Sequence, residues 1–125
     1  MGGLIFAAPA SGSGKTTVTL GFLRAAARQG VAIRSAKSGP DYIDPRFHAA
    51  ASGRECVNLD AWAMTPDRLR NLAAHAPGET LLIEGAMGLF DGAPPEGKGS
   101  SADLARLLGL PVVLIIDCAR LAGSV

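Results

Sequence analysis

The chain has 125 residues, 48% of them hydrophobic, and its 12 basic and 11 acidic side chains give a formal net charge of +1. This length suits one domain with its own core and excludes two domains of ordinary size. The balanced charge, without long runs of either sign, argues against a nucleic-acid or anionic-membrane surface.

Short apolar runs alternate with helix-length segments along the chain. The apolar runs predict strands at 4–9, 31–37, 56–59, 80–86 and 111–117. The segments between them predict helices at 15–29, about 45–52, 66–75 and 101–108. Strands that are apolar along their whole length are buried on both faces. We therefore expect an α/β fold, a Rossmann-like sandwich with a mostly parallel sheet and helices on both faces.

The ends of the chain carry further expectations. The first residues lack the basic region of a secretory signal, and no apolar stretch reaches the roughly 20 residues that span a bilayer. Cys56 and Cys118 fit neither a disulfide framework nor a CxxC metal site, so we expect a protein of the reducing cytoplasm. We also expect both cysteines to be buried structural residues. The sequence stops after an apolar strand, before the helix that should cover it. We expect residues 1–125 to be the N-terminal part of a larger protein; the alternative is a strand at a sheet edge or in a partner.

The segment PASGSGKTT, residues 9–17, lies between the first predicted strand and a helix, as a P-loop requires. Gly12 and Gly14 allow a tight turn whose N–H groups surround a phosphate. Lys15 would reach the β and γ phosphates of ATP, and the Thr16 hydroxyl would ligate Mg²⁺. Pro9 departs from the pattern, which has glycine there. The pattern indicates a P-loop NTPase-type domain, and its expected nucleotide-binding residues are Ser11, Gly12, Ser13, Gly14, Lys15, Thr16 and Thr17.

Carboxylates follow two later strands. Glu84 ends the strand at 80–86, and ligands of open α/β sheets collect at that edge. Because an isolated buried carboxylate is costly, we interpret Glu84 as a second Mg²⁺ ligand rather than a loop cap. Asp91 could bind substrate or metal, or only shape its turn. Asp117 could be functional or cap the next loop.

The segment KSGPDYIDP, residues 37–45, concentrates polar chemistry after the second strand. Its prolines disfavour helix at the preceding residues and give a rigid polar loop. Lys37 would contact a phosphate or a substrate carboxylate. Asp41 and Asp44 would present carboxylates to Mg²⁺ or substrate, and Tyr42 a flat ring. The alternative is that Asp44 caps the following helix.

Three other side chains have two interpretations each. His48, on the helix after Pro45, could face the substrate or pack within the fold. Trp62 and Met64 are more typical of a core or an interface than of a ligand site.

KSGPDYIDPRFHAAASG, SGSGKTT and EGAMGLFDG together resemble the nucleotide-binding domain of the cobyrinic acid or hydrogenobyrinic acid a,c-diamide synthases, over essentially all 125 residues. The resemblance implies amidation of the a and c carboxylates of a corrin in cobalamin biosynthesis. ATP would activate each carboxylate as an acyl phosphate, and ammonia from glutamine would displace the phosphate. Lys15, Lys37 and Asp41 would be catalytic, Thr16, Glu84 and Asp41 would hold Mg²⁺, and Tyr42, Asp44 and Asp91 would bind substrate.

The resemblance also implies a glutaminase domain with a cysteine nucleophile, which these residues do not contain. Neither Cys56 nor Cys118 has the small neighbours of a nucleophile elbow. The fragment alone would at most use free ammonia. We also expect a homodimer. Two alternatives are a dethiobiotin synthetase-like ligase and a ParA- or MinD-like ATPase switch, although such switches carry a lysine where this chain has Ala10.

Overall fold

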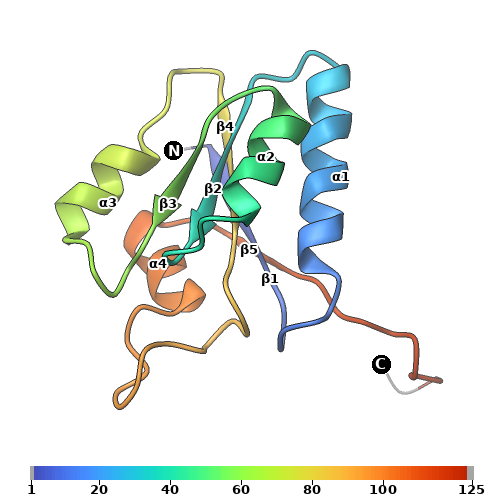
Figure 1. The fold of residues 1–125 in the computed structure, drawn as a ribbon, viewed down its shortest axis with the longest axis vertical. Helices are drawn as coiled ribbons and strands as arrows, with labels where there is room; N and C mark the ends of the chain where they lie inside the picture. The colour runs from blue at the N-terminus through green and yellow to red at the C-terminus, as the bar shows by residue number, and fades with distance from the viewer. Residues whose placement is uncertain (1, 124–125) are drawn as a thin grey trace.

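A computed structural model of the chain describes residues 2–123. Five strands form one sheet in the order β3-β2-β4-β1-β5, and every paired strand is parallel to its neighbour. The predicted α/β fold with a parallel sheet is therefore confirmed (Figure 1). The strands are β1 (Gly3–Ala7), β2 (Ile33–Ser38), β3 (Cys56–Leu59), β4 (Thr80–Glu84) and β5 (Val112–Leu114).

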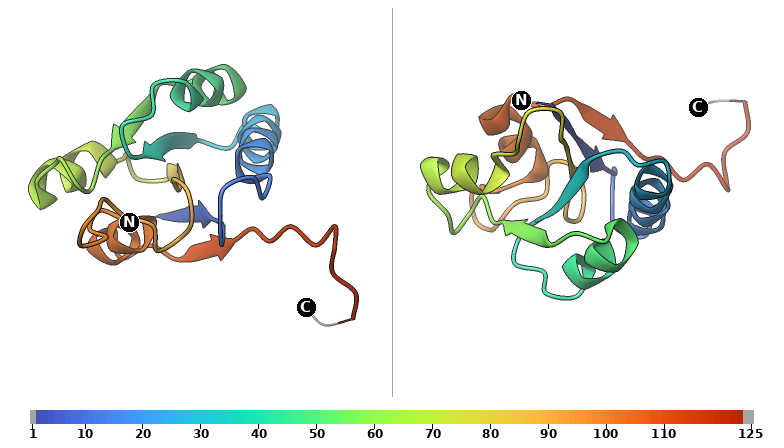
Figure 2. Two further views of the ribbon diagram at one scale, coloured as in Figure 1. Left: turned by 60° about the horizontal axis from the view of Figure 1, so that its bottom comes forward. Right: turned by 90° about the horizontal axis from the view of Figure 1, so that it is seen from above.

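Four helices cover the sheet, one pair on each face, as Figure 2 shows. Helices α1 and α2 lie on one face, and α3 and α4 on the other. Among residues 2–123, no helix is both long and apolar enough to cross a membrane. The helices are α1 (Lys15–Arg28), α2 (Asp44–Ser52), α3 (Pro66–Ala73) and α4 (Ser101–Leu108).

Strand β4 shows why both faces need helices. Successive side chains of a strand point to opposite faces. Leu81 and Ile83 belong to the core beneath α3 and α4, whereas Leu82 belongs to the core that includes Leu23 of α1. All three β4 side chains are fully buried. The continuous apolar run at 80–86 is therefore explained by the burial of β4 on both faces of the sheet.

Strand β5 differs from the other strands. It lies at an edge of the sheet that the described residues form. Val112, Val113 and Leu114 are 36%, 45% and 43% exposed. The segment that follows runs away from the sheet (Figure 2), and Cys118 on it is exposed. The expectation that Cys118 is buried is wrong, because an edge strand without a covering helix offers no core for it.

Helix α4 begins with a complete capping box. The Ser100 hydroxyl accepts a hydrogen bond from the Asp103 amide (3.1 Å), and the Asp103 carboxylate accepts one from the Ser100 amide (3.1 Å). Ser100 is therefore the N-cap of α4. Helix α3 is capped in a similar way, because the side chain of its N-cap residue Thr65 accepts a hydrogen bond from the Arg68 amide.

Replacing Ser100 by alanine is expected to lower the free energy of unfolding by about 1 kcal/mol, because an amide of the first turn loses its partner. Urea denaturation measures the change. Ser100→Asn is the matched control, because asparagine caps as well as serine, and it should keep most of the stability. An equal loss of unfolding free energy in both variants would show that the side-chain cap does not stabilise α4.

Candidate active site

Three adjacent strands end at one edge of the sheet and bring the predicted residues together. Strands β2, β4 and β1 are neighbours, and all are parallel, so their carboxyl ends meet. Lys37 of β2 lies directly opposite Glu84 of β4, and Glu84 lies opposite Phe6, near the end of β1. The P-loop follows β1. The geometry thus places the candidate site where ligands of open α/β sheets bind.

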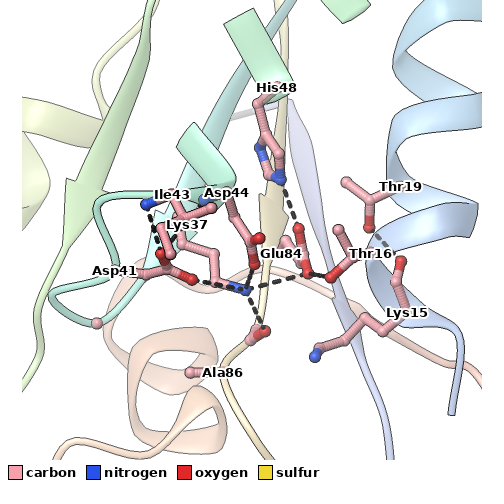
Figure 3. Close-up of polar contacts among 12 residues, drawn as sticks. Lys15, Thr16, Thr19, Lys37, Asp41, Ile43, Asp44, His48, Glu84 and Ala86 are labelled. Atoms are coloured by element: carbon pink, nitrogen blue, oxygen red, sulfur yellow. Dashed lines mark hydrogen bonds and ion pairs between the residues drawn. The ribbon is translucent and has the colours of Figure 1, made fainter. Parts of the chain in front are cut away.

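The carboxylate of Glu84 is the centre of the site (Figure 3). It is fully buried. Its Oε1 accepts hydrogen bonds from the Thr16 hydroxyl (2.5 Å) and from Lys37 Nζ (3.0 Å), and its Oε2 lies 2.5 Å from His48 Nε2. Burial alone would raise the pKa of Glu84, but the hydrogen bonds from His48 and Thr16 and the charge of Lys37 outweigh it and lower the pKa to about 2. Glu84 is therefore ionised at neutral pH.

The ammonium group of Lys37 is equally enclosed, since the residue is only 4% exposed. It donates to Asp44 Oδ2 (2.7 Å) and to the Gly85 carbonyl (3.5 Å), in addition to Glu84, and lies 3.9 Å from Asp41 Oδ2. Burial lowers the pKa of Lys37, but the hydrogen bond to Asp44 and the charge of Glu84 overcome this and raise it. The predicted position of Lys37 beside the P-loop edge is confirmed, and its ammonium stays charged.

The two aspartates of the GPDYIDP segment have different places. Asp41 Oδ1 accepts hydrogen bonds from the amides of Ile43 (2.8 Å) and Asp44 (3.2 Å), so it fixes the turn before α2. Burial alone would raise the pKa of Asp41, but the hydrogen bonds from these two amides outweigh burial and hold the pKa below its usual value. The alternative that Asp44 caps the helix is wrong: Ile43 is the N-cap residue, and the Asp44 carboxylate bonds Lys37. Tyr42 between them is 81% exposed.

The P-loop has the backbone that the pattern predicts. Gly12 and Gly14 have φ angles of +81° and +83°, in the left-handed region that favours glycine. They line an open cavity of about 330 Å³ together with Lys15, Thr16 and Thr17. The Ser13 hydroxyl donates to the Ala10 carbonyl, whereas no hydrogen bond holds the Ser11 side chain among the described residues. Nucleotide binding by these residues stays a prediction.

Lys15 contrasts with Lys37. Its ammonium has no hydrogen-bond or ion-pair partner within residues 2–123, as Figure 3 shows, although the residue is only 9% exposed and lines the P-loop cavity. Burial and the charge of Lys37 lower the pKa of Lys15. The unpaired ammonium of Lys15 is available to bind an incoming anion such as a phosphate group.

The remaining predicted acids lie in loops. Asp91 Oδ2 accepts a hydrogen bond from the Gly88 amide (2.8 Å), so this side chain shapes its turn; its contact with substrate or metal stays a prediction. Asp117 is exposed, and its carboxylate accepts from the Ala119 amide, which confirms the loop-capping alternative.

His48 is the residue that the sequence left most open. The structure decides for packing within the fold, since His48 is fully buried, yet it is bonded to the central carboxylate. Its Nδ1 lies 3.4 Å from the half-buried Cys56 Sγ. Burial alone would lower the pKa of His48, but its hydrogen bonds to Cys56 and Glu84 raise it to about 9. The available signal was the i,i+4 spacing from Asp44, which puts both side chains on one helix face.

The raised pKa of His48 predicts a pH-dependent stability. The native state keeps a proton that the unfolded chain loses near pH 6.5, so the stabilisation is complete below that pH and is lost as pH rises through about 9. Urea unfolding at pH 6.5 and 9.5 should show this fall for the wild type. The His48→Gln variant lacks the titrating group, so its stability should not show this fall. Parallel pH slopes for the two proteins would contradict the assignment.

Thr16 and Glu84 fit the ligands of a nucleotide-bound Mg²⁺. Within residues 2–123 no group of three or more His, Cys, Asp or Glu side chains could hold a metal ion by itself. Mg²⁺ that binds with substrate phosphates needs only one or two carboxylates from the protein. The adjacent Thr16 hydroxyl and Glu84 carboxylate provide such oxygens.

Comparisons with known proteins agree with this geometry. Residues 4–124 match the family model described as CobQ/CobB/MinD/ParA nucleotide binding domain. The chain is 62% identical over its whole length to a hydrogenobyrinate a,c-diamide synthase of Brucella anthropi, of which it covers 29%. It is 59% identical to proteins of the same name from a Sinorhizobium species, again over its whole length and 29% of that protein, and from Mesorhizobium japonicum, over 91% of the chain and 27% of that protein.

These matches confirm the resemblance found in the sequence, and they span less than a third of each relative's length. The P-loop after β1, the acid at the end of β4 and the match over residues 4–124 lead to one conclusion. The chain belongs to the family of CobQ/CobB/MinD/ParA nucleotide-binding domains.

Proposed function

We propose that the whole protein is an ATP-dependent ligase that amidates the a and c carboxylates of hydrogenobyrinate or cobyrinate in cobalamin biosynthesis. The observation that carries the proposal is the convergence of Lys15, Lys37 and the buried Glu84 beside the P-loop. The names of the relatives supply the substrate. Their greater length is consistent with a glutaminase domain that delivers ammonia, and we propose a cytoplasmic homodimer.

The reaction balances in two steps. An oxygen of the substrate carboxylate attacks the γ-phosphorus of ATP, the bond to the β-phosphate oxygen breaks, and ADP leaves. Ammonia then attacks the acyl carbon of the acyl phosphate, and phosphate leaves with the former carboxylate oxygen while nitrogen loses a proton. Phosphoryl transfer depends mainly on positioning and on neutralising charge.

The residues of this edge have suitable roles. Lys15 would hold the β and γ phosphates, and Lys37, oriented by Asp44 and Glu84, would face the transferred group. Thr16, Glu84 and Asp41 would hold Mg²⁺, which when bound neutralises phosphate charge. The site contains three carboxylates, from Asp41, Asp44 and Glu84. Three cationic side chains balance them, those of Lys15, Lys37 and His48. The site is thus nearly neutral before nucleotide enters, so an anion meets no excess of negative charge.

The deciding experiment follows ADP release and product mass with the full-length protein, ATP, glutamine and hydrogenobyrinate. We expect ADP only when the corrin carboxylates are present, and a product with two amides. An ATPase switch would instead hydrolyse ATP slowly without the corrin and respond to a protein or DNA partner. Corrin-independent hydrolysis without amide product would refute the ligase.

A further inference from the structure

A second cavity lies at the same edge of the sheet and shares no lining residue with the P-loop cavity. It encloses about 250 Å³. Its wall includes Ser38, the residue after Lys37, and Ala86, two residues after Glu84. The loops after β2, β3 and β4 form it, whereas the P-loop follows β1. A molecule in this cavity would approach Lys37 past Ser38 and Ala86 and not through the P-loop cavity.

An exposed tryptophan forms one wall of the cavity. Trp62 is 68% exposed, so it lies outside the core, which was one of the two places, core or interface, that the sequence favoured for it. Its backbone is nevertheless fixed, because Asp60 Oδ1 accepts hydrogen bonds from the amides of Trp62 (3.1 Å) and Ala63 (3.2 Å). A Cβ atom on Gly99 would lie 2.7 Å from the Trp62 nitrogen, so the neighbouring turn packs tightly against it. A large ring held by rigid backbone and left uncovered is suited to a flat ligand.

The same cavity has a cation and a constrained floor. Lys98 lines it, and its ammonium pairs with Glu96 at 2.8 Å, where both side chains are largely exposed. Such exposed pairs are weak and exchange readily for another carboxylate. Met87 on the floor is 52% exposed and is the one non-glycine residue with positive φ (+49°) among the described residues. Backbone strain of this kind tends to occur at functional sites.

We propose that this cavity is the substrate subsite, in which the indole of Trp62 lies against the apolar face of the macrocycle and Lys98 pairs with a carboxylate that does not react. The inference rests on the proposed function, since it takes a polycarboxylate macrocycle as the substrate. The cavity holds only part of such a ring, and the reacting carboxylate would extend past Ser38 and Ala86 toward Lys37. Trp62 and Lys98 are then specificity-determining residues.

The test is steady-state amidation by the full-length protein with Trp62→Ala, Trp62→Phe and Lys98→Met. We expect Trp62→Ala to raise KM for hydrogenobyrinate about tenfold, with KM for ATP nearly unchanged, because only the macrocycle contact is lost. Trp62→Phe should recover part of the affinity. Lys98→Met should raise the same KM about fivefold and weaken its dependence on salt.

Phe47→Ala and Arg46→Met are the matched controls. Both residues are exposed and line a different groove on the outer face of α2, so neither variant should change KM for hydrogenobyrinate. Unchanged KM for hydrogenobyrinate in both Trp62→Ala and Lys98→Met, or a rise in KM for ATP alone, would overturn the subsite while the wild-type amidation still supports the ligase. A wild-type protein that does not amidate hydrogenobyrinate would overturn the proposed function itself, and the subsite with it.

Discussion

The Lys37→Met variant is expected to amidate about 10² to 10³ times more slowly than the wild type, because a preorganised charge at the transferred phosphoryl group is lost. It should also be less stable. Lys37 is the closest cation to Asp44, at 2.7 Å, and bonds the fully buried Glu84. Removing one partner of a buried ion pair leaves the other uncompensated, at a cost of about 3–5 kcal/mol.

Kinetics and urea denaturation separate the two effects of this substitution. The double variant Lys37→Met/Glu84→Gln is the informative control, since it removes the unpaired charge. It should recover much of the lost stability and none of the activity. A Lys37→Met protein with wild-type turnover would remove Lys37 from the mechanism.

The Lys15→Met variant is expected to bind ATP at least about 10² times more weakly, with little loss of fold stability. The reason is that the Lys15 ammonium has no partner among the described residues, so its removal breaks no hydrogen bond or ion pair of the free protein, and methionine keeps most of the buried side-chain volume. Losing a charge-assisted bond to phosphate costs roughly 1.5–3 kcal/mol for each bond.

Calorimetric titration with ATP measures the affinity, and thermal unfolding measures the stability. Arg24→Met is the matched control, because Arg24 is an exposed cation on the same helix and away from the P-loop cavity. It should leave ATP affinity unchanged. Undiminished binding by Lys15→Met would contradict the P-loop assignment.

The fold could be predicted from the sequence because its determinants are local. Apolar runs such as 80–86 and the Pro, Gly and Ser signals between them predicted the nine helices and strands found within residues 2–123, with ends that differ by a few residues. Parallel pairing then places the ends of adjacent strands together, which is why Lys37, Glu84 and the P-loop could be assigned to one edge.

What the sequence did not predict depends on contacts between distant residues. The bond between His48 and Glu84 joins positions 36 residues apart, so the spacing that aligns His48 with Asp44 shows a shared face but not its target. The position of Trp62 in a cavity wall depends on loops that follow three different strands, so local sequence does not reveal it. Asp41, and not Asp44, holds the turn, because Lys37 attracts the Asp44 carboxylate.

The central claim is that a substrate carboxylate attacks the γ-phosphate of ATP at this edge of the sheet. Hydrogenobyrinate labelled with ¹⁸O in its a and c carboxylates tests it most directly. The full-length protein should release inorganic phosphate that carries one labelled oxygen for every amide formed. Amide product accompanied by unlabelled phosphate would contradict the acyl-phosphate route and the roles given to Lys15 and Lys37.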